Sequence, residues 1–200
     1  MKLPNILTLS RFALAGLMMA LLFAEFAGSK TLALAVFVLA GITDALDGRL
    51  ARRVYGITPF GSLFDPLADK VLVCAAFVSF VELRLVPAWL VVLIITREFL
   101  VTGLRLLAGR EGGVLSADAW GKHKTVWQML VIAVVLLGLA VQHDLLPHWR
   151  LFNPGDFDQF FHQSAYVISW IAAVITTVSG AAYFSKHRAL FVRHAEGAAS

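Results

Sequence analysis

The sequence predicts an all-α membrane protein in which six transmembrane helices pack as a bundle. Composition is the first reason: 59% of the 200 residues are hydrophobic, only 15% are charged, and the mean hydropathy is +0.78. A soluble domain of this size could not bury so much apolar surface. The second reason is that apolar stretches of about 20 residues, the length that crosses a bilayer, follow one another with short connections. The whole chain, residues 1–200, is therefore interpreted as a single membrane domain.

The predicted helices lie between residues that interrupt the apolar stretches. Glycine and proline mark the connections, at Gly28, Gly56 with Pro59, Pro87, Gly112 with Gly113, and the segment 147–158. The stretches between them predict helices over residues 6–26, 30–53, 62–82, 87–108, 120–142 and 160–185. The single cysteine, Cys74, lies inside one of these stretches, so no disulfide is predicted.

The positions of lysine and arginine predict how the helices cross the membrane. Cytoplasmic flanks carry an excess of these residues, and most of them fall on the side of the N-terminus. Both termini are therefore predicted to be cytoplasmic, and the connection 142–163 is predicted to face outward. The basic residues are spread along the chain and not gathered in one segment, so membrane topology accounts for the net charge of +4 and the isoelectric point near 9.5. No nucleic-acid partner is predicted.

Four aspartates stand out in so apolar a chain, namely Asp44, Asp47, Asp65 and Asp69. A charged side chain at membrane depth costs about 2.5–3.5 kcal/mol, so its presence there indicates a function. Residues three or four positions apart share a helix face, as Asp44 does with Asp47 and Asp65 does with Asp69. The short connection containing Gly56 would make the two helices antiparallel neighbours, so both pairs are predicted to face one cleft at the cytoplasmic interface.

The chemistry of these aspartates favours a metal site. Carboxylates cannot stay ionised close together without cations between them, and hard oxygen ligands suit Mg²⁺ or Mn²⁺. A pair of such ions could clamp a diphosphate. Gly48 and Ala51 share the face of Asp44 and leave room for a ligand, while Arg52 could reach a phosphate. In the alternative interpretation, nearby basic residues merely neutralise the aspartates; these are Arg49, Arg52, Arg53 and Lys70.

The same residues resemble a known family. Segment 44–69 fits the pattern D-x2-D-G-x2-A-R-x8-G-x3-D-x3-D at every fixed position, which is the signature of the CDP-alcohol phosphatidyltransferases. The resemblance implies a six-helix membrane fold, a site for two metal ions, and CDP-diacylglycerol as the phosphatidyl donor. It also implies that Asp44, Asp47 and Asp65 are metal ligands. Asp69 would be either a fourth ligand or the base that deprotonates the acceptor hydroxyl.

Donor-binding residues are implied by the same resemblance. In the family, the nucleotide is held by the motif helix and by an N-terminal segment. Gly48, Arg52 and Thr58 match the first group by position, and Asn5 and Thr8 match the second. Gly48 would permit close approach, and Arg52 would supply a forked donor for phosphate. Helix capping is the alternative interpretation of Asn5 and Thr8.

Further basic residues favour an acceptor that carries its own phosphate, namely Arg97, Arg105, Lys122 and Lys124. So many cations beside a carboxylate cleft suit a phosphorylated acceptor better than a neutral alcohol. Arg105, Lys122 and Lys124 could instead be cytoplasmic anchors. Arg97 lies about half-way along its predicted helix. Because the adjacent Glu98 is not expected to share its face, a ligand or an aspartate is predicted as the partner of Arg97.

Segments 3–11, 63–70, 96–105 and 121–129 resemble the bacterial branch of the family whose acceptor is sn-glycerol 3-phosphate. This resemblance implies phosphatidylglycerophosphate and CMP as products, and a place in phospholipid biosynthesis at the cytoplasmic (inner) membrane, among membrane lipids. Homodimers are common in the resembled family. A cardiolipin or phosphatidylinositol-phosphate synthase is the alternative within the family. Outside it, the alternative is a metal-ion transporter, although the two related halves common in transporters are not visible.

Overall fold

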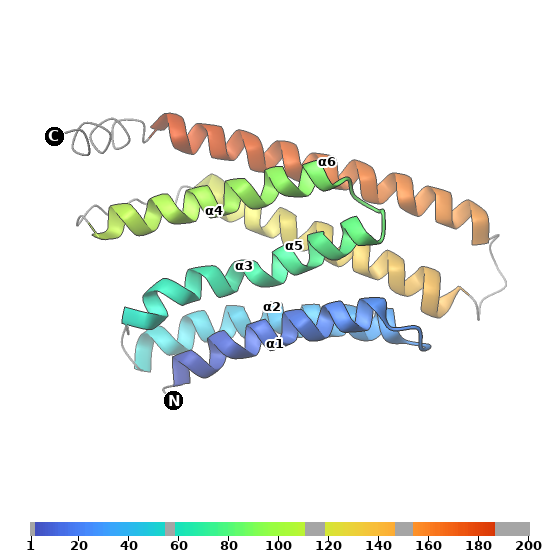
Figure 1. Ribbon diagram of the computed structural model, residues 1–200, viewed down its shortest axis with the longest axis horizontal. Coiled ribbons are helices and arrows are strands. Elements are labelled where there is room, and N and C mark those ends of the chain that lie inside the picture. Colours follow the sequence, from blue (N-terminus) through green and yellow to red (C-terminus); the bar gives the residue numbers. More distant parts are fainter. Residues whose placement is uncertain (1–2, 55–58, 111–118, 147–153, 187–200) are drawn as a thin grey trace.

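Six long helices run back and forth in one bundle, which Figure 1 shows as a computed structural model. The structure describes the backbone of residues 3–54, 59–110, 119–146 and 154–186, and the side chains of residues 9–43, 70–104, 126–146, 155 and 157–185. The elements are α1 (Leu3–Phe23), α2 (Ser29–Val54), α3 (Pro59–Glu82), α4 (Ala88–Arg110), α5 (Ala119–Ala140), the π-helix η1 (Val141–Leu145) and α6 (Pro154–Lys186). These described ranges contain no strand, so the all-α prediction is confirmed.

Three helices begin three or more residues earlier than predicted: α1 at Leu3 instead of residue 6, and α3 and α6 each at a proline. α3 starts at Pro59 instead of residue 62, and α6 starts at Pro154 instead of residue 160. Proline is favoured at the first helical position, because its φ angle is already helical and its missing N–H would have no partner there. Treating these prolines as loop residues was wrong. The outward connection predicted over 142–163 is correspondingly shorter, because η1 and α6 occupy most of it.

The packing of the helices gives the bundle a shared apolar core. α1 contacts α2 and α3, α5 contacts α2, α3 and α6, and α4 contacts α3 and α6. Met18 of α1, Phe77 of α3, Leu90 of α4 and Ile132 of α5 are completely buried between them. Because α1 and α5 each touch both α2 and α3, the two helices that carry the aspartate motif are held by the same pair of neighbours.

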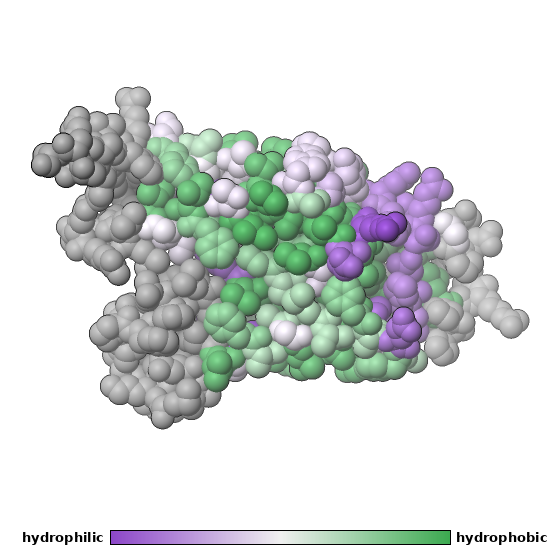
Figure 2. All heavy atoms as spheres, in the orientation of Figure 1, coloured by the Kyte–Doolittle hydropathy of each residue, from purple (hydrophilic) through white to green (hydrophobic). Residues whose placement is uncertain are grey.

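Many large apolar side chains lie on the outside of the bundle. Figure 2 shows hydrophobic residues over the middle of the visible face. Large apolar side chains are exposed on every helix, for example Leu17, Leu39, Val78, Val92, Leu137 and Val174. Soluble monomers rarely expose such continuous apolar surface. Judged on the described side chains alone, two segments, Val126–Leu145 and Phe157–Ser185, are long and apolar enough to cross a membrane. These features support association with a membrane.

The turn between α1 and α2 is fastened by two charged side chains. Lys30 Nζ donates to the carbonyls of Leu22 and Ala24, at 2.6 and 2.8 Å, and so satisfies acceptors at the end of α1. Asp144 of η1 accepts hydrogen bonds from the backbone N–H groups of Gly28 (3.0 Å) and Thr31 (2.7 Å), at the start of α2. Asp144 therefore caps α2 from a distant part of the chain and ties the end of α5 to it.

Replacing Asp144 with alanine should lower the stability of the purified protein by about 1 kcal/mol, because the first N–H groups of α2 would lose a charged acceptor. Thermal unfolding in detergent, followed by circular dichroism, measures the loss. The matched control is His143→Ala, which changes an exposed neighbour in η1 and should leave the unfolding temperature unchanged. Equal unfolding temperatures for both variants would show that the cap contributes nothing.

The turn between α3 and α4 is closed by backbone hydrogen bonds. Arg84 adopts a left-handed conformation (φ 57°) just after α3. The N–H of Arg84 donates to the carbonyl of Val81, and the N–H of Leu85 donates to that of Phe80, each at 2.9 Å. This is the hydrogen-bond pattern that ends many helices, and the buried side chains of Leu85 and Phe80 complete it. The turn sets how α4 lies against α3.

Candidate functional site

One end of the bundle gathers the segments that carry the predicted site residues. Successive helices run in opposite directions, so the start of α1, the end of α2, the start of α3, the end of α4 and the start of α5 lie together (Figure 1). The turns fastened by Lys30 and Arg84 lie at the opposite end. Residues predicted from five separate segments therefore belong to one end of the molecule.

The four aspartates lie on helical backbone on either side of the connection 55–58. Asp44 and Asp47 belong to α2, and Asp65 and Asp69 belong to α3. At about 1.5 Å per residue, Asp44 and Asp69 each lie about 15 Å from the helix end at this connection, and Asp47 and Asp65 each lie about 10 Å from it. The helical backbone puts the members of each pair on one face, and the two pairs at matching depths.

Other motif residues follow the same helices. Gly48 and Arg52 lie on α2, one turn apart, and Gly61 lies in the first turn of α3. Gly61 was expected in a loop, and its helical position follows from the start of α3 at Pro59. Thr58 lies outside the described residues.

The donor set of the motif fits a divalent cation. It consists of carboxylates only, which are ligands for hard ions such as Mg²⁺ and Mn²⁺, and α2 and α3 carry them at matching depths. No group of three or more histidine, cysteine, aspartate or glutamate residues occurs among the side chains that the structure describes. The motif side chains lie outside that set, so their role as metal ligands stays a prediction.

The N-terminal candidates belong to the first helix. Asn5 and Thr8 lie within the first two turns of α1, which begins at Leu3. A capping residue precedes the first helical residue, so the capping interpretation is not supported by their positions. Their side chains lie outside the described set, and contact with the nucleotide stays a prediction.

The basic candidates lie on two helices, α4 and α5. Arg97 and Arg105 belong to α4, and Lys122 and Lys124 belong to the first two turns of α5. Of these four side chains the structure describes only that of Arg97. Arg97 is the tenth residue of the 23 in α4, and its side chain is 11% exposed. It is a cation held inside the bundle.

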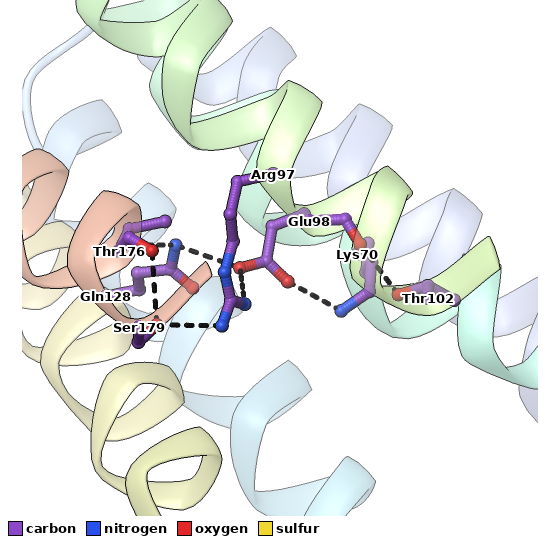
Figure 3. A network of polar contacts seen from close by, with 7 residues as sticks. All are labelled: Lys70, Arg97, Glu98, Thr102, Gln128, Thr176 and Ser179. Carbon is purple, nitrogen blue, oxygen red and sulfur yellow. Dashed lines mark hydrogen bonds and ion pairs between the residues drawn. The ribbon is translucent and has the colours of Figure 1, made fainter. Parts of the chain in front are cut away.

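A buried carboxylate, Glu98, connects three helices at this depth (Figure 3). Its Oε2 accepts a hydrogen bond from Lys70 Nζ of α3 at 2.8 Å. Its Oε1 accepts from Arg97 Nη1 and from Gln128 Nε2 of α5, both at 3.3 Å. The Glu98 side chain is only 6% exposed. Because Lys70 directly follows Asp69 in α3, this network reaches the aspartate motif through a single peptide bond.

The pairing of Arg97 with Glu98 was not expected from the sequence, while a ligand or an aspartate as a further partner of Arg97 stays a prediction. Neighbouring residues point about 100° apart around a helix, and for this reason they were not expected to meet. Arg97 and Glu98 meet because both are long side chains that turn toward α5 and α6 (Figure 3). Lys70, considered a neutralising partner for the aspartates, forms an ion pair with Glu98.

Helix α6 completes the network with residues that were not predicted. Ser179 Oγ accepts a hydrogen bond from Arg97 Nη2 at 2.8 Å, and Thr176 Oγ1 lies 3.4 Å from Gln128 Nε2. Gly180 lies directly against the Arg97 side chain. A usable signal existed, because small and hydroxyl residues at spacings of three and four form one polar stripe on an otherwise apolar helix.

The fold and the motif together define a class: a helical bundle, apolar on its outside, that carries an aspartate motif for phosphate chemistry at one end. Comparison with known families agrees with this class. Residues 1–179 match the family model described as CDP-alcohol phosphatidyltransferase. Because the match covers most of the chain, the protein belongs to the CDP-alcohol phosphatidyltransferase family. Members of this family generally use divalent metal ions.

Curated relatives align over nearly the whole chain. A protein of Bacillus subtilis (strain 168), named CDP-diacylglycerol–glycerol-3-phosphate 3-phosphatidyltransferase, is 38% identical over 198 residues, covering 93% of this chain and 95% of the relative. A protein of the same name from Rickettsia typhi is 31% identical, covering 95% of this chain and 99% of the relative. A probable phosphatidylglycerophosphate synthase of Mycobacterium tuberculosis (strain H37Rv) is 35% identical, covering 92% and 81%.

Proposed function

We propose that this protein transfers the phosphatidyl group of CDP-diacylglycerol to sn-glycerol 3-phosphate, giving phosphatidylglycerophosphate and CMP. One observation carries the proposal: the aspartate motif lies on the adjoining ends of α2 and α3, in a chain that aligns almost end to end with relatives named for this reaction. The partly buried cations Lys70 of α3 and Arg97 of α4 support an acceptor that brings its own negative charge.

The donor side of the site is assigned to α1, α2 and α3. Asp44, Asp47, Asp65 and Asp69 would hold two divalent ions, Mg²⁺ or Mn²⁺. When bound, such ions neutralise a diphosphate and stabilise the charge that develops on the leaving phosphate. Gly48 would let the diphosphate approach the backbone of α2, and Arg52 would donate to its oxygens. Asn5, Thr8 and Thr58 would contact the cytidine.

The transfer is proposed as a single displacement. The acceptor hydroxyl oxygen forms a new bond to the phosphorus that carries diacylglycerol, and the bond from that phosphorus to the CMP oxygen breaks. Asp69 either accepts the proton of the hydroxyl as a general base or serves as the fourth ligand. A covalent phosphatidyl-protein, trapped with labelled donor in the absence of acceptor, would contradict this route.

The acceptor side is assigned to α4 and α5. Arg97, Arg105, Lys122 and Lys124 would bind the phosphate of sn-glycerol 3-phosphate. The network around Glu98 supports this role, because it holds the Arg97 guanidinium inside the bundle on the helix that also carries Arg105.

The orientation in the membrane is also a proposal. All six helices would span the bilayer of the bacterial cytoplasmic (inner) membrane; even the 21 residues of α1 extend about 32 Å, against a hydrocarbon core of about 30 Å. The end that carries the motif would face the cytoplasm, where CDP-diacylglycerol, sn-glycerol 3-phosphate and the divalent ions meet. A second copy of the chain could accompany it as a homodimer.

The deciding experiment is an assay of CMP release by the purified protein with CDP-diacylglycerol and one alcohol at a time. Release that depends on sn-glycerol 3-phosphate and on Mg²⁺ or Mn²⁺ is the expected result. Release only with phosphatidylglycerol or with inositol phosphate would assign the protein to the alternative acceptors, as a cardiolipin or phosphatidylinositol-phosphate synthase. No release with any alcohol would contradict the proposed activity.

Replacing Arg105 with alanine should raise the KM for sn-glycerol 3-phosphate about 10- to 100-fold, because a charge-assisted hydrogen bond contributes about 1.5–3 kcal/mol. The KM for CDP-diacylglycerol should change little. Steady-state CMP release, with each substrate varied in turn, measures both constants. The control is Arg84→Ala, at an exposed arginine of the opposite end. A similar rise in both KM values would argue against a role for Arg105 in acceptor binding.

A further inference from the structure

Helix α6 touches the Arg97 side chain at two places. Ser179 Oγ accepts a hydrogen bond from Arg97 Nη2 at 2.8 Å. A Cβ atom at Gly180 would lie 2.7 Å from Arg97 Cγ, which is closer than real Cβ atoms approach a neighbour, and 3.3 Å from Arg97 Nε, which is a tight contact. Ser179 thus contacts the head of the arginine, and Gly180 leaves the space that its stem occupies.

The direction of the Ser179 hydrogen bond is set by a second contact. The Ser179 hydroxyl donates to the carbonyl of Thr176, one turn earlier in α6, at 3.1 Å. A hydroxyl has a single proton, so once it is donated the oxygen presents its lone pairs to Arg97. Ser179 is 7% exposed, and water does not readily compete for these positions. The serine is therefore oriented as an acceptor for the guanidinium.

The contacts from α6 and α4 together fix the plane of the guanidinium. Glu98 Oε1 lies 3.3 Å from Nη1, and Ser179 Oγ lies 2.8 Å from Nη2, so the two terminal nitrogens have partners on different helices (Figure 3). The planar fork of arginine binds phosphate well only when its orientation matches the phosphate oxygens. A small rotation of that plane would weaken phosphate binding without removing the charge.

We propose that Ser179 and Gly180 are positioning residues for Arg97, through which α6 sets the affinity of the enzyme for its phosphorylated acceptor. The inference rests on the proposed function, in which Arg97 binds the phosphate of sn-glycerol 3-phosphate. Neither residue belongs to the aspartate motif, and the residues that would hold the donor lie on α1, α2, α3 and the connection 55–58. A change at Ser179 or Gly180 should therefore act on the acceptor and spare the donor.

The first test is Ser179→Ala. Loss of a hydrogen bond to a charged group should raise the KM for sn-glycerol 3-phosphate about tenfold, while the KM for CDP-diacylglycerol stays within about twofold. Ser169→Ala is the matched control. Ser169 is another buried serine of α6, and its hydroxyl has no hydrogen-bond partner among the described residues. This control should leave both KM values unchanged.

The second test is Gly180→Ala, which forces the Arg97 stem to move and should also raise the KM for the acceptor selectively. Its control is Gly138→Ala, where a Cβ would lie 2.0 Å from Phe161 Cε2, in a contact between α5 and α6 that contains no site residue. Gly138→Ala should lower the unfolding temperature but leave the ratio of the two KM values at its wild-type level. If Gly180→Ala only loosened α6 in general, the ratio of the two KM values would change little in both variants. That result would contradict the positioning role of Gly180.

The outcomes separate this inference from the function on which it rests. CMP release by the wild-type protein that does not require sn-glycerol 3-phosphate would overturn the proposed function, and this inference with it. Wild-type release with sn-glycerol 3-phosphate, together with an unchanged acceptor KM in Ser179→Ala, would overturn the positioning role alone. A rise of equal size in both KM values in Ser179→Ala would also overturn it, because a positioning residue for Arg97 should not affect the donor.

Discussion

Replacing Asp47 with asparagine should reduce CMP release by about 100-fold or more while the helical bundle stays folded. Asp47 lies on α2 at a depth that matches Asp65 on α3, so its carboxylate is assigned to the proposed metal pair. Metal ions contribute several kcal/mol to transition-state stabilisation, and about 1.4 kcal/mol corresponds to a tenfold change in rate. The amide keeps the size of the side chain but loses the charge that a divalent ion requires. The rate of CMP release at saturating substrates, with Mg²⁺ or Mn²⁺ varied, measures the effect.

The matched control removes a carboxylate from α3, at the end of that helix that lies far from the motif. Glu82→Gln changes an exposed residue at the last position of α3 and should retain wild-type activity. Circular dichroism and gel filtration in detergent should give the same helix content and elution for both variants. Full activity in Asp47→Asn would remove Asp47 from the metal site. Loss of helix content would show a structural role instead.

Replacing Glu98 with glutamine should destabilise the protein by about 3 kcal/mol, the lower end of the range for breaking a buried ion pair. The lower end applies because Lys70, one of the two cations that share this carboxylate, is 22% exposed and can keep part of its hydration. Unfolding of the purified protein in mixed micelles, followed by circular dichroism, gives the change in free energy. Activity should fall as well, because Lys70 follows Asp69 and Arg97 belongs to the proposed acceptor site.

A double-mutant cycle separates the ion pair from the general effect of changing a buried residue. Adding Lys70→Met to Glu98→Gln removes one of the two cations, so the double variant should be more stable than the sum of the single losses predicts. The exposed residue Glu25 supplies the control, Glu25→Gln, which should unfold like the wild type. Strictly additive losses would show that Glu98 and Lys70 do not stabilise each other.

Much of the fold could be predicted from the sequence, because an apolar stretch of membrane length has few other structures open to it. All six helices are present, and most of their ends lie within a few residues of the predicted ones. The largest error falls at the start of α6, and the start of α3 and both ends of α1 are each displaced by three residues. At Pro59 and Pro154 the cause is that proline begins a helix although it also marks turns. The π-helix η1 could not be predicted, since its wider hydrogen-bonding pattern leaves no distinct signal in composition.

The candidate site, like the fold, could be predicted only in part. The aspartate motif is conspicuous because it places four charges in an apolar chain, and all four residues lie on helical backbone of α2 and α3, as expected. Their role as metal ligands stays a prediction. The network around Glu98 could not be assembled in advance. Its members come from four helices, and which faces of α4, α5 and α6 meet depends on packing, which a single sequence does not state. Arg97 and Glu98 also form an ion pair although they are adjacent in the sequence. Rules based on which residues share a helix face do not predict such a pair.

The fastened turns at the end opposite the motif have a mechanical consequence. There, Asp144 joins η1 to α2, Lys30 closes α1 onto α2, and the backbone bonds around Arg84 close α3 onto α4. Local opening of the bundle at this end would have to break all of these hydrogen bonds, so the backbone N–H groups in these turns should be protected from hydrogen exchange.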